Sequence, residues 1–455
     1  MLLQPSIIER NEYCVGFLSP AQSKQLLCKT ALGNADQSFP ESFDIDGLVE
    51  KCGGIPLILD LIGSKLREHV EDTATCKELV TSLKKSLTEG EGEMCERVVD
   101  VVYNSFKESS QKEAFLDIVF FLNNLPWRIV SYVVGMDNLE ALENAGLVHL
   151  CREDKLKRDT GVRPKWVELE KFVKDVDYQT GTVKVVDTVR ARGRKLSNSD
   201  RILDDVNSIS KAFECRQKLK GIWLSDKVKL NVESERFAST MSRSRILHFG
   251  QKVKVNGVCR ENFESLRYLN GHDLPVDVKN AKKLAFLVGN VPYGVSQLPS
   301  SLRLLELRSN SGIRAGLLES VCNLSSLEEL NLKFSSRRQL MLPATFTQLQ
   351  CLRFLELKLN LATLPDSFGN LTALEGLSLK YCTKLQSLPE SFCELKCLRF
   401  LRIEEGILTE LPERFGNLSA LEELHFSCCH LVNLPASFGK LESLRILGLY
   451  WCTTI

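Results

Sequence analysis

A repeated pattern of apolar positions runs through the C-terminal part of the chain. Leu-Pro recurs with its prolines 22, 24, 23 and 23 residues apart, and a phenylalanine and then a leucine follow each proline. Each period continues with the phrase apolar-x-x-apolar-x-apolar, which begins at Leu352, Leu374, Leu398, Leu421 and Leu444. The alternation at its end predicts a short strand with two inward apolar side chains. Units of this size bury that face only by stacking, so the pattern predicts a solenoid with one continuous core.

Weaker copies extend the pattern toward the N-terminus. The phrases at Leu302 and Leu327 fit well, whereas those at Leu266 and Leu284 fit poorly. Ile246–Phe249 is predicted to be the first strand. We therefore expect nine or ten units between about residue 241 and the end of the chain.

The regular periods resemble the leucine-rich repeat. In that family, a small polar or thiol residue three positions after the strand bonds backbone groups of the neighbouring turn. Asn360, Cys382, Cys429 and Cys452 occupy this position here, and Gly406 departs from it. The resemblance implies a horseshoe of parallel strands.

The first half of the chain has a helical pattern. Gly53 and Gly54 are predicted to end one helix, and Pro56 to begin the next. Between Lys112 and Leu122, four apolar residues share one helical face, namely Phe115, Ile118, Val119 and Leu122. Next we predict a short helix from Leu139 to Asn144, a strand from Gly146 to Leu150, and a helix from Thr188 to Leu196.

These segments resemble, in order, the motifs of plant intracellular disease-resistance proteins that combine an NB-ARC nucleotide switch with leucine-rich repeats (NLR proteins). Lys51–Leu66 is similar to the GLPL motif, and Lys112–Leu122 to the family's FLDIACFF helix. Val185, Val186 and Asp187 stand where the family has Met-His-Asp. Lys220–Ser225 is similar to the strand before the repeats in receptors that carry a TIR domain.

The resemblance implies an α+β multidomain fold. Residues 1–92 would be a remnant of the NB-ARC domain with its helical ARC subdomain, and residues 93–196 a winged-helix subdomain. Residues 197–240 would be a connector, and residues 241–455 the α/β leucine-rich-repeat solenoid.

The chain has no GxxxxGK[ST] phosphate-binding loop, because its one Gly-Lys pair, Gly439-Lys440, is followed by Leu441. The resemblance implies a remnant nucleotide site at Pro56, which would pack on adenine, and Asp187. Val186 replaces the histidine that contacts phosphate and has no ring nitrogen. Asp187 has an alternative role as the cap of the following helix. We therefore expect no cofactor, and bound ADP is the alternative.

Composition narrows the function classes further. The 59 basic and 58 acidic residues give a net charge of +1, which argues against capture of nucleic acid by the whole chain. The six scattered histidines form no triad or metal motif, so we expect neither an enzyme nor a metal protein. The lysine-rich stretch from Cys151 to Gly181 is interpreted as a solvated wing loop, with a nucleic-acid contact as the alternative. The basic run from Arg190 to Lys195 is interpreted as a charged helix face that pairs with an acidic neighbour.

No apolar run is long enough to span a bilayer, and the N-terminus lacks a secretory signal pattern. The 16 cysteines include no CxxC pair, so we interpret them as reduced thiols. These observations predict a cytoplasmic protein, with the nucleus as the alternative location.

The outward positions of the repeat strands are the best candidates for function. Aromatic and acidic residues there predict a protein-binding concave face. Its predicted members are Phe334, Phe354, Tyr381, Phe400, Glu423, Tyr450 and Trp451. The partner would be another protein, a partner receptor, or the winged helix of this chain.

The sequence thus favours an immune-receptor-like interaction scaffold in plant defence and innate immune signal transduction. One alternative is part of an ADP/ATP-dependent NLR switch whose nucleotide-binding core is missing from this gene product. Another is a general leucine-rich-repeat adaptor.

Overall fold

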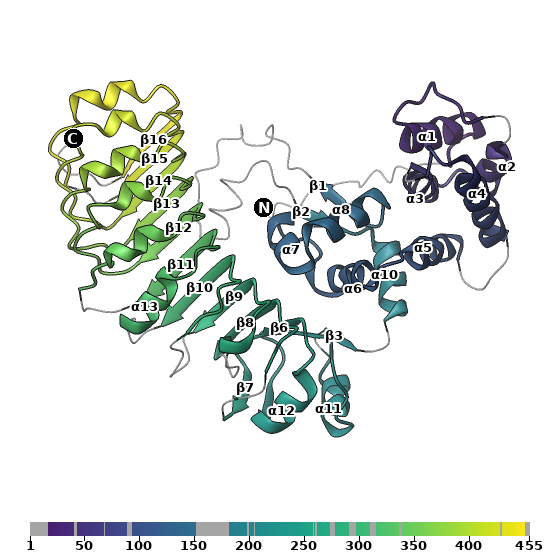
Figure 1. Cartoon of the computed structure of the whole chain (residues 1–455), viewed down its shortest axis with the longest axis horizontal. Helices are drawn as coiled ribbons and strands as arrows, with labels where there is room; N and C mark the ends of the chain where they lie inside the picture. Colours follow the sequence, from purple (N-terminus) through teal and green to yellow (C-terminus); the bar gives the residue numbers. More distant parts are fainter. Residues whose placement is uncertain are drawn as a thin grey trace, which may run out of the picture. The chain divides into compact units, whose positions relative to one another are not determined.

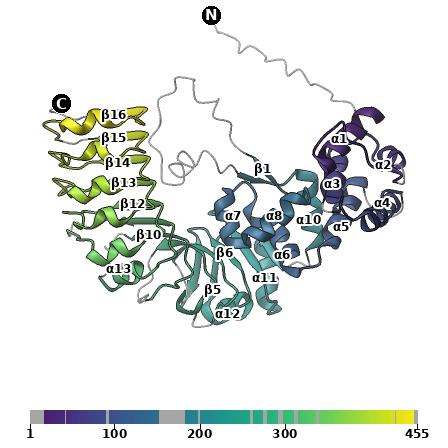
Figure 2. The same ribbon diagram turned by 45° about the horizontal axis from the view of Figure 1, so that its top comes forward.

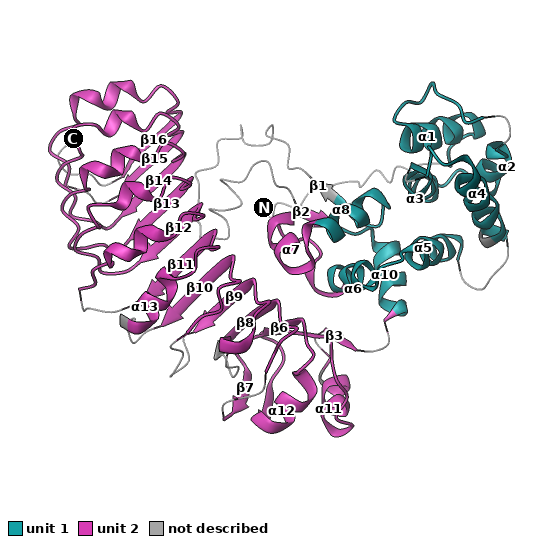
Figure 3. Ribbon diagram, viewed as in Figure 1, with its two compact units in different colours: residues 1–119, 137–149, 184–196 teal, residues 120–136, 150–183, 197–455 magenta. Residues whose placement is uncertain are grey.

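The computed structural model describes residues 17–450 except 41–42, 68, 89–92, 152–181, 198–199, 204, 258, 260–261, 274–277, 291–296, 310–314, 336–338 and 428–429. The chain divides into two compact units (Figure 3). Unit 1 comprises Met1–Val119, Asp137–His149 and Lys184–Leu196, and unit 2 comprises Phe120–Met136, Leu150–Val183 and Ser197–Ile455. The predicted segment 93–196 is therefore divided between the two units.

Unit 1 is helical. Its helices are α1 (Pro20–Leu32), α2 (Ile45–Lys51), α3 (Pro56–Arg67), α4 (Thr73–Thr88), α5 (Met94–Ser105), α6 (Ser109–Asp117), most of α8 (Met136–Asn144), and α10 (Asp187–Leu196). A two-stranded sheet of β1 (His149–Cys151) and β2 (Thr182–Lys184) lies at the unit boundary. The strand predicted at Gly146–Leu150 thus begins three residues later, at His149.

The corner between α2 and α3 follows the sequence prediction. Gly53 and Gly54 have φ angles of +60° and +69°, a region that glycine adopts without steric cost. The backbone N–H of Leu18 donates to the carbonyl of Gly54 at 2.9 Å. This contact ties the segment before α1 to the corner, and Pro56 then begins α3.

Helix α10 packs on α5 and α6. The side chains of Phe115, Ile118 and Val119 are fully buried, which confirms the predicted apolar face. Arg192 Nε donates to Asp100 at 2.8 Å, and Lys195 pairs with Glu96. The predicted pairing of this basic run with an acidic neighbour is therefore present, and the neighbour is α5.

Unit 2 is built on a parallel sheet of twelve strands in the order β16 to β8, then β6, β4 and β3 (Figures 1 and 2). The strands before the repeat core are β3 (Arg201–Leu203), β4 (Gly221–Leu224), β6 (Ile246–Phe249), β8 (Tyr268–Asp273) and β9 (Phe286–Asn290). The next are β10 (Leu304–Ser309), β11 (Glu329–Phe334), β12 (Phe354–Lys358), β13 (Gly376–Lys380), β14 (Phe400–Glu404), β15 (Glu423–Ser427) and β16 (Ile446–Tyr450).

The remaining elements of unit 2 flank this sheet. Strands β5 (Leu230–Glu233) and β7 (Val253–Asn256) form a separate parallel pair. The helices are α7 (Trp127–Val134), α11 (Val206–Glu214), α12 (Ser234–Met241) and α13 (Ala315–Cys322). The one-turn helices are η3 (Val278–Asn280), η4 (Ala344–Gln348), η5 (Phe368–Asn370), η6 (Glu390–Glu394), η7 (Phe415–Asn417) and η8 (Ala436–Lys440), while the π-helix η1 (Ile118–Leu122) crosses the unit boundary.

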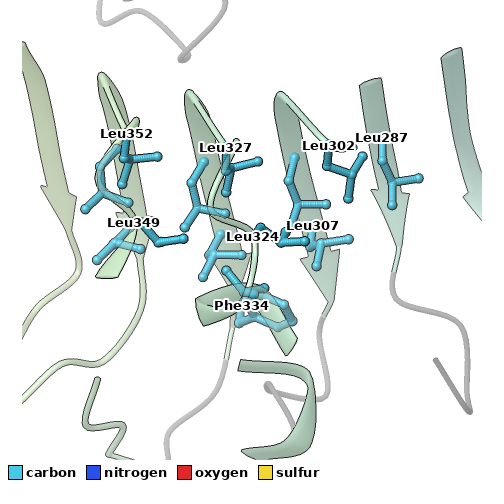
Figure 4. Close-up of a cluster of buried hydrophobic side chains, with 14 of the residues drawn as sticks. Leu287, Leu302, Leu307, Leu324, Leu327, Phe334, Leu349 and Leu352 are labelled. Carbon is cyan, nitrogen blue, oxygen red and sulfur yellow. The ribbon is translucent and has the colours of Figure 1, made fainter. Parts of the chain in front are cut away.

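The repeat prediction is confirmed in its core and corrected at its start. Leu305, Leu330 and Leu355 align in register on neighbouring strands and are fully buried. Figure 4 shows apolar side chains from β9, β10 and β11, and from the turns that precede β10, β11 and β12, gathered in one cluster. The sheet does not begin at Ile246, because β3 and β4 precede it in the same parallel order.

The prolines and phenylalanines of each period form the side of the solenoid away from the strands. Each phenylalanine lies in a one-turn helix, from η4 to η8. The ring centroids of Phe368 and Phe392 are 6.0 Å apart, and those of Phe392 and Phe415 are 6.5 Å apart, with the rings nearly parallel. This stack continues the leucine core to the outer edge of the repeats.

Candidate interaction surface

The face of the sheet opposite the leucine core carries three rows of side chains, and we call it the concave face. The first, third and fifth residues of each strand point to it, because successive strand residues alternate. Register between strands aligns them. From β10 to β16, the first row is Leu304, Glu329, Phe354, Gly376, Phe400, Glu423 and Ile446. The middle row is Glu306, Asn331, Glu356, Ser378, Arg402, His425 and Gly448. The third row is Arg308, Lys333, Lys358, Lys380, Glu404, Ser427 and Tyr450.

Helix α7 contacts the middle of the concave face. The Arg128 guanidinium lies 3.6 Å from the Glu329 carboxylate, 3.7 Å from that of Glu328, and 5.0 Å from the centroid of the Phe354 ring. The Tyr132 hydroxyl donates to Glu328 at 2.8 Å, and burial raises the pKa of this phenol. Arg128 is only 4% exposed, so this is a desolvated ion-pair cluster.

An aromatic stack covers the first strands of the sheet. The Trp223 ring stacks on His248 with centroids 3.7 Å apart, and Tyr268 stacks on Phe286 at 4.3 Å. Phe121, which precedes α7, stacks against Trp223 at 6.5 Å. Residues 120–136 therefore contact β4 through Phe121 and the first row of β11 and β12 through Arg128.

The concave face from β13 to β16, which we call its open part, carries two exposed tyrosines and several partly buried charged side chains. Tyr381, which follows β13, is 43% exposed, and the Lys358 ammonium lies 4.5 Å from the centroid of its ring. Arg402 pairs with Glu404 at 3.7 Å, and His425 lies 3.6 Å from Glu423. Tyr450 stacks on His425 and is 38% exposed. Aromatic rings beside charges of both signs are typical of protein-contact surfaces.

Three of the predicted surface residues are buried. Phe334 is in the leucine core and 4% exposed, because β11 continues through it and the alternation turns it inward with Leu332. Phe354 and Phe400 do belong to the first row, but Arg353 and Arg399 cover their rings and Arg128 also lies over Phe354. The prediction that these three rings are exposed is therefore wrong.

Tyr381, Glu423 and Tyr450 lie on or beside the open part of the concave face. Tyr381 holds the same position after its strand as Phe334, but its φ angle of +57° turns the chain out of the strand. The Tyr381 ring consequently points away from the leucine core and is exposed. Trp451 lies outside the described residues.

The sequence interpretation missed the middle row. Arg402 and His425 stand between the last two apolar residues of the repeat phrase, so strand alternation alone places them on the concave face. The same reasoning would have placed Lys358 and Lys380 on this face, because they stand two residues after the middle-row residues of their strands. The interpretation considered only the position before the strand core and the position after it.

The remaining predicted positions lie apart from this surface. Pro56 and Asp187 begin two different helices of unit 1, α3 and α10, and both are exposed. The Cys382 thiol donates to the carbonyl of Leu359 in the preceding repeat at 3.4 Å, which confirms the predicted backbone contact for this residue. Burial raises the pKa of Cys382 to about 12, so it is a neutral structural donor. Cys429, Cys452 and the basic stretch at 152–181 lie outside the described residues.

Within the described ranges, no group of three or more His, Cys, Asp or Glu side chains has the arrangement of a metal site. In the same part of the chain, no helix combines the length and the apolar character that a bilayer crossing requires.

Comparison with known proteins agrees with the repeat geometry. Residues 343–454 match the family model described as a leucine-rich repeat region. A stretch of 146 residues is 29% identical to the disease resistance protein RML1B of Arabidopsis thaliana and covers 31% of this chain. The match spans 14% of that protein's length.

Three similar solved structures have low TM-scores. A TDR receptor is 20% identical, with a TM-score of 0.40, over 56% of this chain and 48% of that chain. The ectodomain of the Arabidopsis thaliana receptor kinase GASSHO1/SCHENGEN3, in complex with CASPARIAN STRIP INTEGRITY FACTOR 2, is 20% identical, with a TM-score of 0.37, over 57% and 35% of the two chains. An internalin from Listeria monocytogenes is 16% identical, with a TM-score of 0.37, over 53% and 76%. Residues 343–454 are thus a leucine-rich-repeat region, and the same parallel strands continue toward the N-terminus as far as β3.

Proposed function

We propose that this chain is an immune-receptor-like scaffold of plant defence that binds a protein partner through the concave face of its repeats. The observation that carries the proposal is the open part of that face, where Tyr381, His425 and Tyr450 lie among charged side chains. The 29% identity to a plant disease resistance protein supports the immune context. A scaffold of this kind has no catalytic residues and acts in the cytoplasm.

The proposal assigns α1 to α4, within residues 1–92, to a helical ARC subdomain, and the segment from α5 to α10, within residues 93–196, to a winged-helix subdomain. The two-glycine corner before Pro56 supports the first assignment. The buried face of Phe115 and Val119, on which α10 packs, supports the second. Within unit 2, the α7 cluster on β11 and β12 supports an internal contact between the winged-helix segment and the repeats.

The chain should purify without a nucleotide. We expect the supernatant of the denatured protein to contain less than one-tenth of an equivalent of ADP or ATP, and we expect calorimetric titration with either nucleotide to give no binding heat. The reason is that the sequence lacks a phosphate-binding loop and has Val186 in place of a phosphate-contacting histidine. Stoichiometric ADP would instead support the alternative that the chain is part of a nucleotide switch.

The scaffold proposal also predicts that a defence response depends on a partner. Transient expression of the chain alone in leaves should give no cell death, and co-expression with a full-length resistance protein that binds it should change that protein's response. Tyr381→Ala should remove the effect while leaving expression unchanged, and Lys396→Gln, on the outer side of the repeats, should retain it. Full cell death from this chain alone would contradict the proposal. An effect that persists in Tyr381→Ala would show that the partner does not bind the concave face.

A further inference from the structure

A row of four cations crosses neighbouring strands on the concave face. Arg308, Lys333, Lys358 and Lys380 are the third-row residues of β10 to β13, and parallel register places them side by side. All four side chains are at least partly exposed. We call them the basic row. The middle row beside it is buried on the same strands and consists of Glu306, Asn331, Glu356 and Ser378.

The basic row carries more positive charge than the carboxylates of the middle row neutralise. Arg308 pairs with Glu306, and Lys380 lies 3.0 Å from Glu356. Lys333 lies between these two carboxylates, 3.6 Å from each. Among the described residues, no carboxylate lies within 4.0 Å of Lys358, which contacts the exposed Tyr381 ring. Four cations over two carboxylates leave a local excess of two positive charges.

The middle row also contains polar atoms that have no hydrogen-bond partner among the described residues. Asn331 Oδ1 and Ser378 Oγ are buried and make no hydrogen bond, and each side chain is only 1% exposed. Buried acceptors without a partner are unusual in a folded protein. Both atoms lie in the middle row, directly beside the cations. Almost no solvent reaches either atom, so a ligand donor would bond to them only after the side chains that enclose them move.

We propose that the basic row binds an extended acidic protein segment. Four strands spaced about 4.8 Å apart make a row about 14 Å long, and five extended residues cover nearly the same length. Acidic side chains at three alternate positions of such a segment would therefore face the row together. Its apolar atoms would pack on the exposed Tyr381 ring. The inference rests on the proposed function and names the chemistry of the partner.

The carboxylates of the middle row favour a protein segment over other polyanions as the ligand. Glu306 and Glu356 would repel a continuous line of phosphates, whereas a segment with spaced carboxylates leaves room for them. Nucleic-acid binding also draws its affinity from many phosphate contacts, and this row offers four cations.

The test uses the full chain and a short fluorescein-labelled peptide with glutamate at three alternate positions, measured by fluorescence anisotropy. We expect Lys358→Gln to weaken binding roughly tenfold and Lys358→Glu to weaken it further, because a charged hydrogen bond is lost and then replaced by repulsion. Raising the NaCl concentration should weaken binding by the wild type more than by Lys358→Gln. Lys396→Gln removes an exposed charge elsewhere in the repeats and should leave the affinity unchanged.

Several outcomes would overturn the inference. The first is no binding of the glutamate peptide, and the second is equal binding of a peptide with glutamine at the same positions. The third is tighter binding of single-stranded DNA or of phosphatidylserine vesicles, which would assign the row to another polyanion. A partner that binds through Tyr381 while the glutamate peptide fails to bind would preserve the proposed function and overturn this inference alone. Thermal unfolding of the variants by circular dichroism would show whether they keep the fold.

Discussion

Replacing Arg128 with alanine should destabilise unit 2 by about 3–5 kcal/mol, the typical cost of removing one partner from a buried ion-pair cluster. Arg128 lies between the carboxylates of Glu328 and Glu329, and Glu329 is itself buried. The variant would also lose the cation above the Phe354 ring. Urea denaturation followed by tryptophan fluorescence, to which Trp127 and Trp223 of unit 2 contribute, measures the change.

Arg303→Ala is the matched control for this experiment. Arg303 pairs with the same carboxylate, Glu328, at 3.1 Å, but its side chain is 44% exposed, whereas that of Arg128 is 5% exposed. Exposed pairs contribute ~0–1 kcal/mol, so its loss should scarcely move the transition. Equal effects of the two substitutions would show that α7 does not form a desolvated cluster on the repeats.

Gly369→Ala should destabilise the repeats by about 3 kcal/mol or more, at the upper end of the cost of overpacking. A Cβ at this position would lie 1.9 Å from the carbonyl oxygen of Ser391 in the next repeat. That atom belongs to the backbone, so relief requires the two repeats to separate. Gly416 meets Ser437 at the same distance and should respond in the same way.

The chain contains its own control for the glycine series. Gly439 occupies the equivalent position in η8, where an added Cβ would meet no atom within 4 Å. Gly439→Ala should be neutral or stabilise by a few tenths of a kcal/mol through the unfolded state. Calorimetric unfolding of the three variants tests this. Similar melting temperatures for Gly369→Ala and Gly439→Ala would contradict the stacking described above.

The repeat spacing was sufficient to predict the strands and the core, because each unit repeats the same local geometry. Leu330, Leu355 and Leu377 are buried as their period requires. The same periodicity does not predict burial correctly where the backbone leaves the regular strand conformation. Phe334 and Tyr381 hold equivalent positions, and only the positive φ angle of Tyr381 separates a core ring from an exposed one.

Long-range contacts could not be predicted from the sequence pattern. The bond between Tyr132 and Glu328 joins residues 196 positions apart, and no local spacing indicates which part of the sheet α7 contacts. The burial of Phe354 follows in part from that contact. The early start of the sheet at β3 was missed for a different reason: its three-residue strand is too short to show a period.

The central claim is that protein partners bind the concave face around Tyr381, where the basic row of β10 to β13 meets the open part from β13 to β16. The most direct measurement is the affinity of a purified partner, identified from plant tissue, for the wild type and for Tyr381→Ala, with Lys396→Gln as the control. Calorimetry should show at least tenfold weaker binding for Tyr381→Ala and an unchanged dissociation constant for Lys396→Gln. Equal affinities for all three proteins would contradict the claim and place the partner on another surface.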